Sequence, residues 1–155
     1  MPHYHYELDK KIADKTELQV ADIICSKMNC ELVDIGLDNK WDLKFKKDGK
    51  YTTVEVKEDF TCERTGNVGL EFSCRGNLSG ISVSQADLYC YKLHEPCGAT
   101  RVYLIKTDRL KQLINDKQYF RIVNGGDFGS NSLNYLFKLS LIQSNSVCIG
   151  EASDD

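Results

Sequence analysis

The sequence has no run of apolar residues close to the ~20 that a helix needs to span a bilayer. Its N-terminal residues also lack the apolar stretch of a secretory signal peptide. The 155 residues suit one domain around one core, and the charged fraction of 28% is typical of a soluble globular protein. These features predict a single domain over residues 1–155 with an acidic tail at 151–155, located in the cytoplasm and not associated with a membrane.

The sequence also has no Cys-x-x-Cys pair among its seven cysteines. A structural zinc site usually needs such closely spaced ligands, and here His94 and Cys97 are the only close His/Cys couple. An odd number of cysteines without a secretory signal argues against a disulfide framework. We therefore interpret the cysteines as reduced residues that pack as small hydrophobic side chains.

An excess of positive charge is missing too, since the net charge is −3. A general DNA-binding protein usually shows a basic surface. There is no Ser-His-Asp pattern and no glycine-rich phosphate loop. An acidic active site that recruits metal ions would account for much of the negative charge, and local basic clusters remain at residues 10–11 and 44–47 and at Arg64 and Arg75.

Hydrophobic periodicity and turn residues predict an α/β fold, with a mixed central sheet flanked by helices. The expected helices cover residues 7–29 and 108–115, the second capped by Thr107, and Ser84 is a candidate cap for a short helix beginning near Gln85. The expected strands cover residues 41–45, 51–56, 68–74, 101–105, 120–123 and 135–142. The predicted order begins with a helix and a three-stranded meander, followed by a helix, a strand and a helix.

The segment 41–56 carries the most informative pattern. Asp48-Gly49 lies between two strand-like stretches and predicts a two-residue hairpin turn. In the register that this turn sets, Asp42 lies directly opposite Glu55, with Cβ atoms roughly 5 Å apart. Because side chains alternate between faces, one face carries the core set Trp41, Leu43, Phe45, Val54 and Val56. The other face carries the polar set Asp42, Lys44, Thr53, Glu55 and Lys57.

Two opposed carboxylates repel each other, so the pair formed by Asp42 and Glu55 needs compensation. A divalent cation would supply it, because Mg²⁺ and Mn²⁺ prefer oxygen ligands. In the expected meander Glu71 joins the same face, and Glu17 reaches it from the first helix, where it interrupts an apolar stripe. The alternative is a solvated polar face on which Lys57 simply neutralises the pair, with Glu17 at the boundary of the core.

The spacing of these residues resembles that of the PD-(D/E)XK nuclease superfamily, whose members have a restriction-endonuclease-like fold. Asp42 is followed, after twelve residues, by Glu55-Val56-Lys57, and Trp41 stands where a proline usually precedes the aspartate. The resemblance covers residues 7–106, and the stretch 65–81 is similar to small phage-type and Holliday-junction resolvase-like members. It implies an αβββαβ core, an extension at 107–150 and, for a phage-encoded protein, action in the host cytoplasm.

The resemblance implies a metal-dependent endonuclease that hydrolyses phosphodiester bonds of DNA, with RNA as an alternative partner. Lys57 would orient or deprotonate the attacking water, or stabilise developing charge. The cofactor implied is Mg²⁺, which Mn²⁺ can replace. The implied metal ligands are Asp42, Glu55, the Val56 carbonyl, and for a second ion Glu17 and Glu71. The residues expected to contact nucleic acid are Lys44, Lys46, Arg64, Arg75, Ser79 and Gln85.

Two other functions stay open on the sequence alone. One is a nucleic-acid-binding module that keeps this fold without cleaving, against which the intact set of Asp42, Glu55 and Lys57 argues. The other is a protein-interaction domain with a solvated acidic face. Dimers are common among such nucleases, so a homodimer is also an expectation. The pattern does not distinguish duplex, branched and single-stranded substrates.

Overall fold

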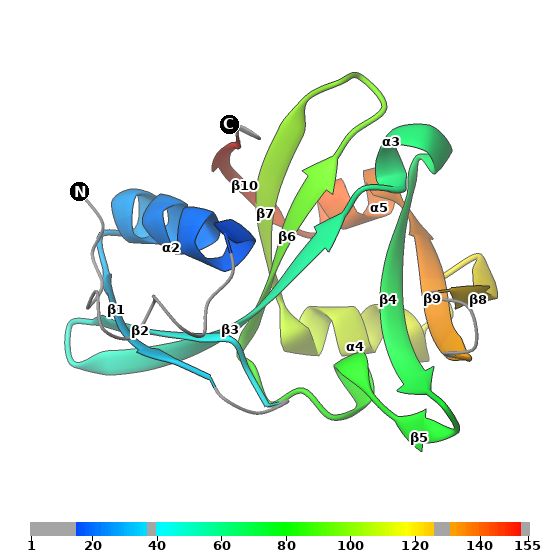
Figure 1. Ribbon diagram of the computed structural model, residues 1–155, viewed down its shortest axis with the longest axis horizontal. Helices are drawn as coiled ribbons and strands as arrows, with labels where there is room; N and C mark the ends of the chain where they lie inside the picture. Colours follow the sequence, from blue (N-terminus) through cyan, green and yellow to red (C-terminus); the bar gives the residue numbers. More distant parts are fainter. Residues whose placement is uncertain (1–14, 37–39, 126–130, 153–155) are drawn as a thin grey trace.

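Two β-sheets with helices packed around them make up the described part of the computed structural model, which comprises residues 15–36, 40–125 and 131–152 (Figure 1). The helices are α2 (Lys15–Met28), α3 (Cys62–Thr65), α4 (Thr107–Asn115) and α5 (Leu139–Ser144), with a 3₁₀ turn η1 (Gly80–Ser82). The strands are β1 (Glu31–Ile35), β2 (Leu43–Lys47), β3 (Lys50–Asp59), β4 (Asn67–Cys74), β5 (Asn77–Leu78), β6 (Leu88–His94), β7 (Thr100–Lys106), β8 (Arg121–Gly125), β9 (Ser132–Lys138) and β10 (Val147–Glu151).

The larger sheet is mixed, which confirms the predicted α/β class. Its six strands run in the order β1-β2-β3-β6-β7-β10, and the smaller sheet has the order β5-β4-β9-β8. Within the larger sheet β3 pairs with β6 in parallel, whereas the other neighbours are antiparallel. No helix in the described residues combines the length and apolar character needed to cross a membrane.

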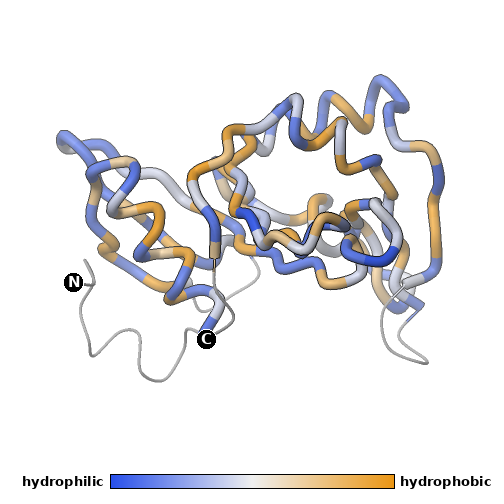
Figure 2. Tube along the Cα trace, turned by 90° about the horizontal axis from the view of Figure 1, so that it is seen from above, coloured by the Kyte–Doolittle hydropathy of each residue, from blue (hydrophilic) through white to orange (hydrophobic). Residues whose placement is uncertain are grey.

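The two faces of the larger sheet bury separate cores. On one face, α2 packs its buried Val20, Ala21 and Ile24 against side chains of β2, β3, β6 and β7. On the other face, β6 and β7 contribute tyrosines and aliphatic side chains to a core shared with β4, β9, α4 and α5. In Figure 2, seen from above, the α2 side lies to the left of the part formed by the smaller sheet. Side chains that alternate along β3 therefore point into two different environments.

The β2–β3 hairpin has the predicted register. Leu43 pairs with Val54 and Lys47 with Lys50, and the turn residues Asp48 and Gly49 both have positive φ, of 51° and 79°. Positive φ at both central positions is the geometry of a type I′ hairpin turn, which Asp-Gly favours. Leu43, Phe45 and Val54 are buried against α2, as expected. Trp41 does not join them: it is half-buried, and the Lys44 ammonium lies 5.9 Å from its ring.

The predicted meander is wrong in its third strand. The segment 68–74 is a strand, but β4 pairs with β5 and β9 in the smaller sheet, and the second neighbour of β3 is β6. The antiparallel meander is instead β1-β2-β3, with β1 missed by the sequence prediction. Asp59 explains the departure, because its carboxylate accepts hydrogen bonds from the N–H groups of Cys62 and Gly69. These bonds fold the chain into α3 and turn β4 out of the plane of β3.

The helix expected near Gln85 is also wrong, since in the described chain η1 and a loop occupy this region and β6 begins at Leu88. Ser84 does accept a cap-like hydrogen bond of 3.2 Å from the Ala86 N–H. However, the Asp87 N–H donates to the Thr53 carbonyl, which ties the segment to β3 instead. Of the implied αβββαβ order, the structure therefore has α2, the meander β1-β2-β3 and the parallel strand β6. The helix expected directly before the last strand is missing from the described residues.

The remaining elements largely follow the prediction. The strands expected at 101–105 and 120–123 are β7 and β8. The helix expected at 7–29 corresponds to α2 (Lys15–Met28), and the part of that prediction before residue 15 lies outside the described residues. Helix α4 begins at Thr107 itself, so Lys106 occupies the cap position and the predicted Thr107 cap is wrong. The strand expected at 135–142 corresponds to β9, which ends at Lys138, and α5 begins at the next residue, Leu139.

Candidate active site

Asp42 lies just before β2, at the point where the pairing of β2 with β3 ends. Its N–H donates to the Val54 carbonyl at 3.0 Å, and its Oδ2 accepts a 2.7 Å hydrogen bond from the Val56 N–H. The Asp42 carboxylate thus accepts the hydrogen bond from β3 that a backbone carbonyl of β2 would accept if the strand pairing continued. Since the N–H and C=O of one strand residue point to the same side, the Val56 carbonyl also faces this edge. The hairpin register fixes Asp42 beside the middle of β3.

Glu55 and Lys57 project from β3 on the face opposite to α2. Their side chains form an ion pair of 3.4 Å, in which the Glu55 side chain is 13% exposed and that of Lys57 40%. Burial, and next the charge of Asp42, raise the pKa of Glu55 from its ordinary 4.5 to about 7, while Lys57 opposes the rise. The two carboxylates therefore lie close enough to repel, as the hairpin pattern predicted, and the single lysine does not compensate for both.

The smaller sheet supplies the opposite wall of the site. Glu71 on β4 reaches it, held by a 2.7 Å hydrogen bond from the Ser132 hydroxyl on β9. Gly80 brings the following loop against β4: its φ is +53°, and a Cβ there would lie 2.0 Å from the Glu71 carbonyl oxygen. Only glycine permits this approach, which places Ser79 next to Glu71. Glu71 joins the site as predicted, but from across a pocket and not from a neighbouring strand.

These residues enclose one pocket of about 360 Å³. Its lining consists of Asp42, Glu55, Lys57, Glu71, Leu78, Ser79, Gly80 and Val83. A second pocket of about 460 Å³ shares Lys57 and Glu71 and continues toward Asn134 of β9. The site is therefore a groove between the two sheets, with three carboxylates and one lysine at its centre. Leu78 and Val83 are apolar members of the lining that the sequence did not indicate.

Two hydroxyl groups, one in the site and one in the core beside it, are buried without a hydrogen-bond partner among the described residues. They are the Ser79 Oγ, in the pocket lining, and the hydroxyl of Tyr89, which is fully buried. Tyr89 pairs with Glu55 in the register of β3 and β6, and its hydroxyl approaches Ser84 without forming a hydrogen bond of normal geometry. Burial, and next the charge of Glu55, raise the pKa of this phenol, so that it stays protonated. An orphaned buried hydroxyl costs about 1–3 kcal/mol, which a bound polar ligand would recover.

Glu17 is not brought to this pocket. It lies on α2, which packs on the face of Leu43 and Val54, whereas Glu55 alternates to the other face. Within the described ranges no three His, Cys, Asp or Glu side chains form a group that could hold a metal ion. The expected joining of Glu17 and Glu71 with the two hairpin carboxylates in one ligand set is therefore wrong for the described residues.

The residues expected to contact nucleic acid are only partly assembled. Lys44 and Lys46 lie on β2, on the same face as Glu55, and Ser79 lines the pocket. Arg64 on α3 and Arg75 in the turn between β4 and β5 are exposed and line neither pocket of the groove. Gln85 is exposed as well, and its N–H donates to the Lys40 carbonyl. Of the four basic residues expected to contact nucleic acid, Lys44 and Lys46 are thus the two that share the sheet face of Glu55.

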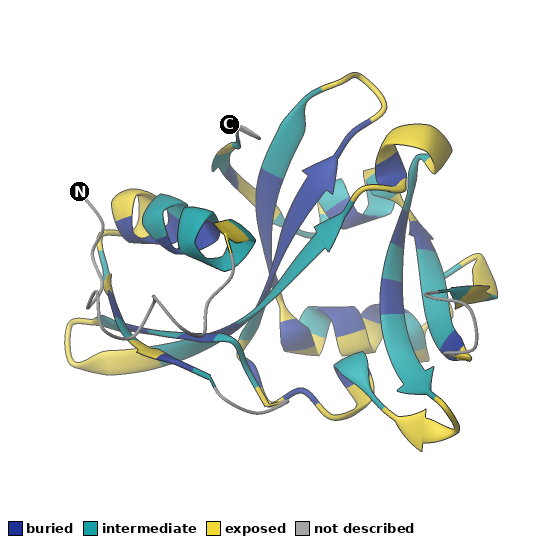
Figure 3. Ribbon diagram, in the orientation of Figure 1, coloured by how far each residue is buried: buried dark blue, intermediate teal, exposed yellow. Residues whose placement is uncertain are grey.

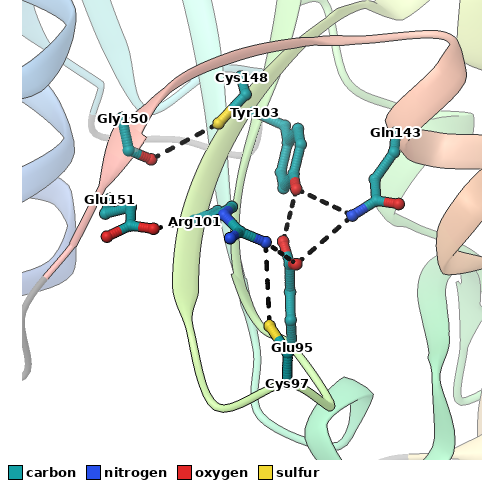
Figure 4. A network of polar contacts seen from close by, with 8 residues as sticks. All are labelled: Glu95, Cys97, Arg101, Tyr103, Gln143, Cys148, Gly150 and Glu151. Atoms are coloured by element: carbon teal, nitrogen blue, oxygen red, sulfur yellow. Dashed lines mark hydrogen bonds and ion pairs between the residues drawn. The ribbon is translucent and has the colours of Figure 1, made fainter.

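A second buried carboxylate provides a useful contrast. Glu95 is 2% exposed and accepts hydrogen bonds from Arg101 at 2.7 Å, from Tyr103 and from Gln143 (Figure 4). Its hydrogen bonds, and next its charge, raise the pKa of Arg101. Both oxygens have partners, so this network joins β6, β7 and α5 and needs no ligand. Asp42 and Glu55 differ from Glu95 in that each lies beside a second carboxylate, and the charge of Asp42 raises the pKa of Glu55.

Comparison with known proteins adds no relative: no protein-family model, curated protein or solved structure matches this chain. The assignment of a function consequently rests on the geometry of the groove.

Proposed function

We propose that this protein is a metal-dependent nuclease that hydrolyses phosphodiester bonds, as the resemblance to the PD-(D/E)XK superfamily implies. The observation that carries the proposal is the proximity of two carboxylates, Asp42 just before β2 and Glu55 on β3. Lys57 lies two residues further along β3 on the same face as Glu55. The order of α2, the meander β1-β2-β3 and the parallel strand β6 supports it as well.

The donor set fits Mg²⁺ better than zinc. Asp42, Glu55 and the Val56 carbonyl offer only oxygen ligands, and Mg²⁺ in phosphate-processing sites is commonly held by one or two carboxylates, with water and substrate phosphate completing the shell. A set of three acidic ligands is not required for that mode. A bound cation would also favour the ionised form of Glu55, whose pKa is raised in its absence. Bound Mg²⁺ would polarise the scissile phosphate and acidify a water.

The chain's own groups would then act on the substrate. Lys57 would add positive charge beside the phosphate and position the attacking water, whose oxygen bonds to phosphorus as one ester P–O bond breaks. Ser79 offers a hydroxyl donor toward the phosphate or its water, and this hydroxyl lacks another partner in the described chain. Glu71, on the opposite wall, would hold water or a more weakly bound second ion.

One observation favours a binding module that does not cleave: the described residues hold no group of three metal-ligating side chains. Incubation of the protein with linear, nicked, flapped and four-way DNA and with RNA, in Mg²⁺ or Mn²⁺, separates the two functions. Metal-dependent cleavage supports the nuclease. Binding without cleavage supports the module.

Two substitutions then distinguish metal binding from chemistry. Asp42→Asn removes a negative ligand at nearly constant shape, so we expect both Mg²⁺ affinity and cleavage to fall. Lys57→Ala removes no ligand, so calorimetry should show Mg²⁺ binding unchanged or tighter while cleavage falls by roughly a hundredfold or more. Full activity in Lys57→Ala, or wild-type activity in excess chelator, would show that the site has been misread.

A further inference from the structure

A row of basic and aromatic side chains leads along the β2–β3 hairpin to the carboxylates. Lys46 pairs with Tyr51 and Lys44 with Thr53, and Glu55 follows on β3 two residues beyond Thr53. All of these side chains share the face opposite to α2. Tyr51 is 56% exposed, and Figure 3 shows the turn end of the hairpin as an exposed projection. At ~3.3 Å per residue, about 13 Å of strand separates Tyr51 from Glu55.

The contacts within this row place positive charge around an accessible ring. The Lys44 ammonium lies 4.9 Å from the centre of the Tyr51 ring, and that of Lys46 lies 5.6 Å from it. Cation–π attraction explains why both lysines lean toward the ring. A tyrosine in a strand is unremarkable by itself, because aromatic residues favour strands. What sets Tyr51 apart is that two ammonium groups lie within 5.6 Å of its ring centre, on the face that carries Glu55.

This arrangement suits an unpaired strand better than a duplex. An aromatic ring can stack only on a base whose own face is free, as in single strands, flaps and loops. A protein that grips duplex nucleic acid usually presents a broad basic surface, whereas this chain has a net charge of −3. Two lysines can bind the phosphates of one strand, and the ring beside them can stack on one base of that strand.

We propose that a single-stranded segment of nucleic acid lies along the hairpin, with phosphates on Lys44 and Lys46 and a base stacked on Tyr51, and enters the groove at Asp42 and Glu55. This inference rests on the proposed nuclease function and names its substrate class as nucleic acid with an unpaired segment. Tyr51 is then a binding residue that the sequence pattern did not indicate.

Binding is measured without cleavage, by fluorescence anisotropy in chelator and in Ca²⁺, with labelled oligothymidylate, oligouridylate and a duplex of equal length. Tyr51→Ala should weaken single-strand binding by about 5- to 150-fold, the range for one lost base–aromatic stack. Tyr51→Phe should restore it. The Lys44→Ala/Lys46→Ala double variant should reduce the slope of log K against log salt by about 1.4, whereas Tyr51→Ala should leave that slope unchanged.

Phe120→Ala is the control for an exposed aromatic side chain, and Lys27→Ala/Lys111→Ala the control for two exposed lysines away from the hairpin; both should bind as wild type. Preference for thymidylate or uridylate decides between DNA and RNA, and either supports the inference. Absence of single-strand binding, wild-type affinity in Tyr51→Ala, or equal losses for duplex and single strand would overturn it. Cleavage of duplex in Mg²⁺ that is unaffected by Tyr51→Ala would overturn this inference alone, whereas Tyr51-dependent binding without any cleavage would overturn the nuclease function alone.

Discussion

Substitution of Glu55 by glutamine should make the protein more stable at pH 8 in the absence of metal, and leave its stability nearly unchanged at pH 4.5. Burial and Asp42 raise the pKa of Glu55 to about 7 from its ordinary 4.5. The folded state therefore binds a proton that the unfolded state has released between these two values, and the wild-type free energy of unfolding falls as the pH rises through this window. Glutamine resembles the protonated carboxyl and removes the dependence.

The size of the effect follows from the same shift. A rise from 4.5 to about 7 corresponds to at most about 3.4 kcal/mol, at ~1.36 kcal/mol per pH unit. The shift already includes the opposing attraction of Lys57, and water screens a carboxyl that is not fully buried, so we expect a net gain of about 1–2 kcal/mol at pH 8. Other groups that titrate in this window contribute equally to both proteins and cancel in the difference.

Urea denaturation of wild type and Glu55→Gln in chelator, at pH values from 4.5 to 8, measures this difference. Glu31→Gln, at an exposed position on β1, is the control and should follow the wild-type curve. Addition of Mg²⁺ at pH 8 should stabilise wild type by RT ln(1 + [Mg²⁺]/Kd) and have little effect on Glu55→Gln. Parallel curves for wild type and Glu55→Gln would refute the argument that Glu55 is held beside a like charge.

Three further predictions concern the surroundings of the site. Gly80→Ala should lower the free energy of unfolding in urea by about 2 kcal/mol or more, because its Cβ would meet the Glu71 carbonyl oxygen. Gly76→Ala is the control: Gly76 also has positive φ but no atom within 4 Å of the added Cβ, so it should cost about 1 kcal/mol, and equal costs would contradict the close approach at Gly80. Tyr89→Phe should raise the free energy of unfolding by about 1 kcal/mol, since the lost hydroxyl has no partner among the described residues; a lower free energy of unfolding would show that the hydroxyl is hydrogen-bonded after all. Glu58→Gln should lower the melting temperature at pH 7. Burial opposes ionisation of Glu58, but hydrogen bonds and Lys92 lower its pKa below 4.5, so its contribution to stability is lost as the pH falls below 4.5 and through the lowered pKa; a difference between the two melting temperatures that does not shrink on acidification would refute this.

The hairpin and its two carboxylates could be predicted from the sequence because their determinants are local. Asp48-Gly49 specifies the turn, the turn specifies the register from Lys47–Lys50 to Leu43–Val54, and Asp42, the next residue, then lies near Glu55. The positions of Glu55 and Lys57 on one face then follow from alternation alone. No contact between distant segments had to be known.

The second sheet could not be predicted in this way. Whether β4 pairs with β3 or β9 depends on the path of the chain after Asp59, and β9 lies more than sixty residues further on. Strand β6 was missed because it is covered on both faces, so that Tyr89 to His94 are all buried and no alternation marks them as a strand. Leu78 lines the groove because β5 follows β4 into the smaller sheet, and its position in the sequence carries no sign of that.

Single-turnover cleavage of an end-labelled single-stranded DNA and RNA by wild type and by Lys57→Ala, purified in parallel, tests the central claim most directly. We expect wild type to cleave one of them in Mg²⁺, to lose activity in excess chelator, and to exceed Lys57→Ala by roughly a hundredfold or more. Parallel purification matters because a contaminating nuclease would be equally active in both preparations. Equal cleavage by the two proteins, or no cleavage by wild type of these strands or of duplex DNA with either Mg²⁺ or Mn²⁺, would contradict the assignment of this groove as a nuclease active site.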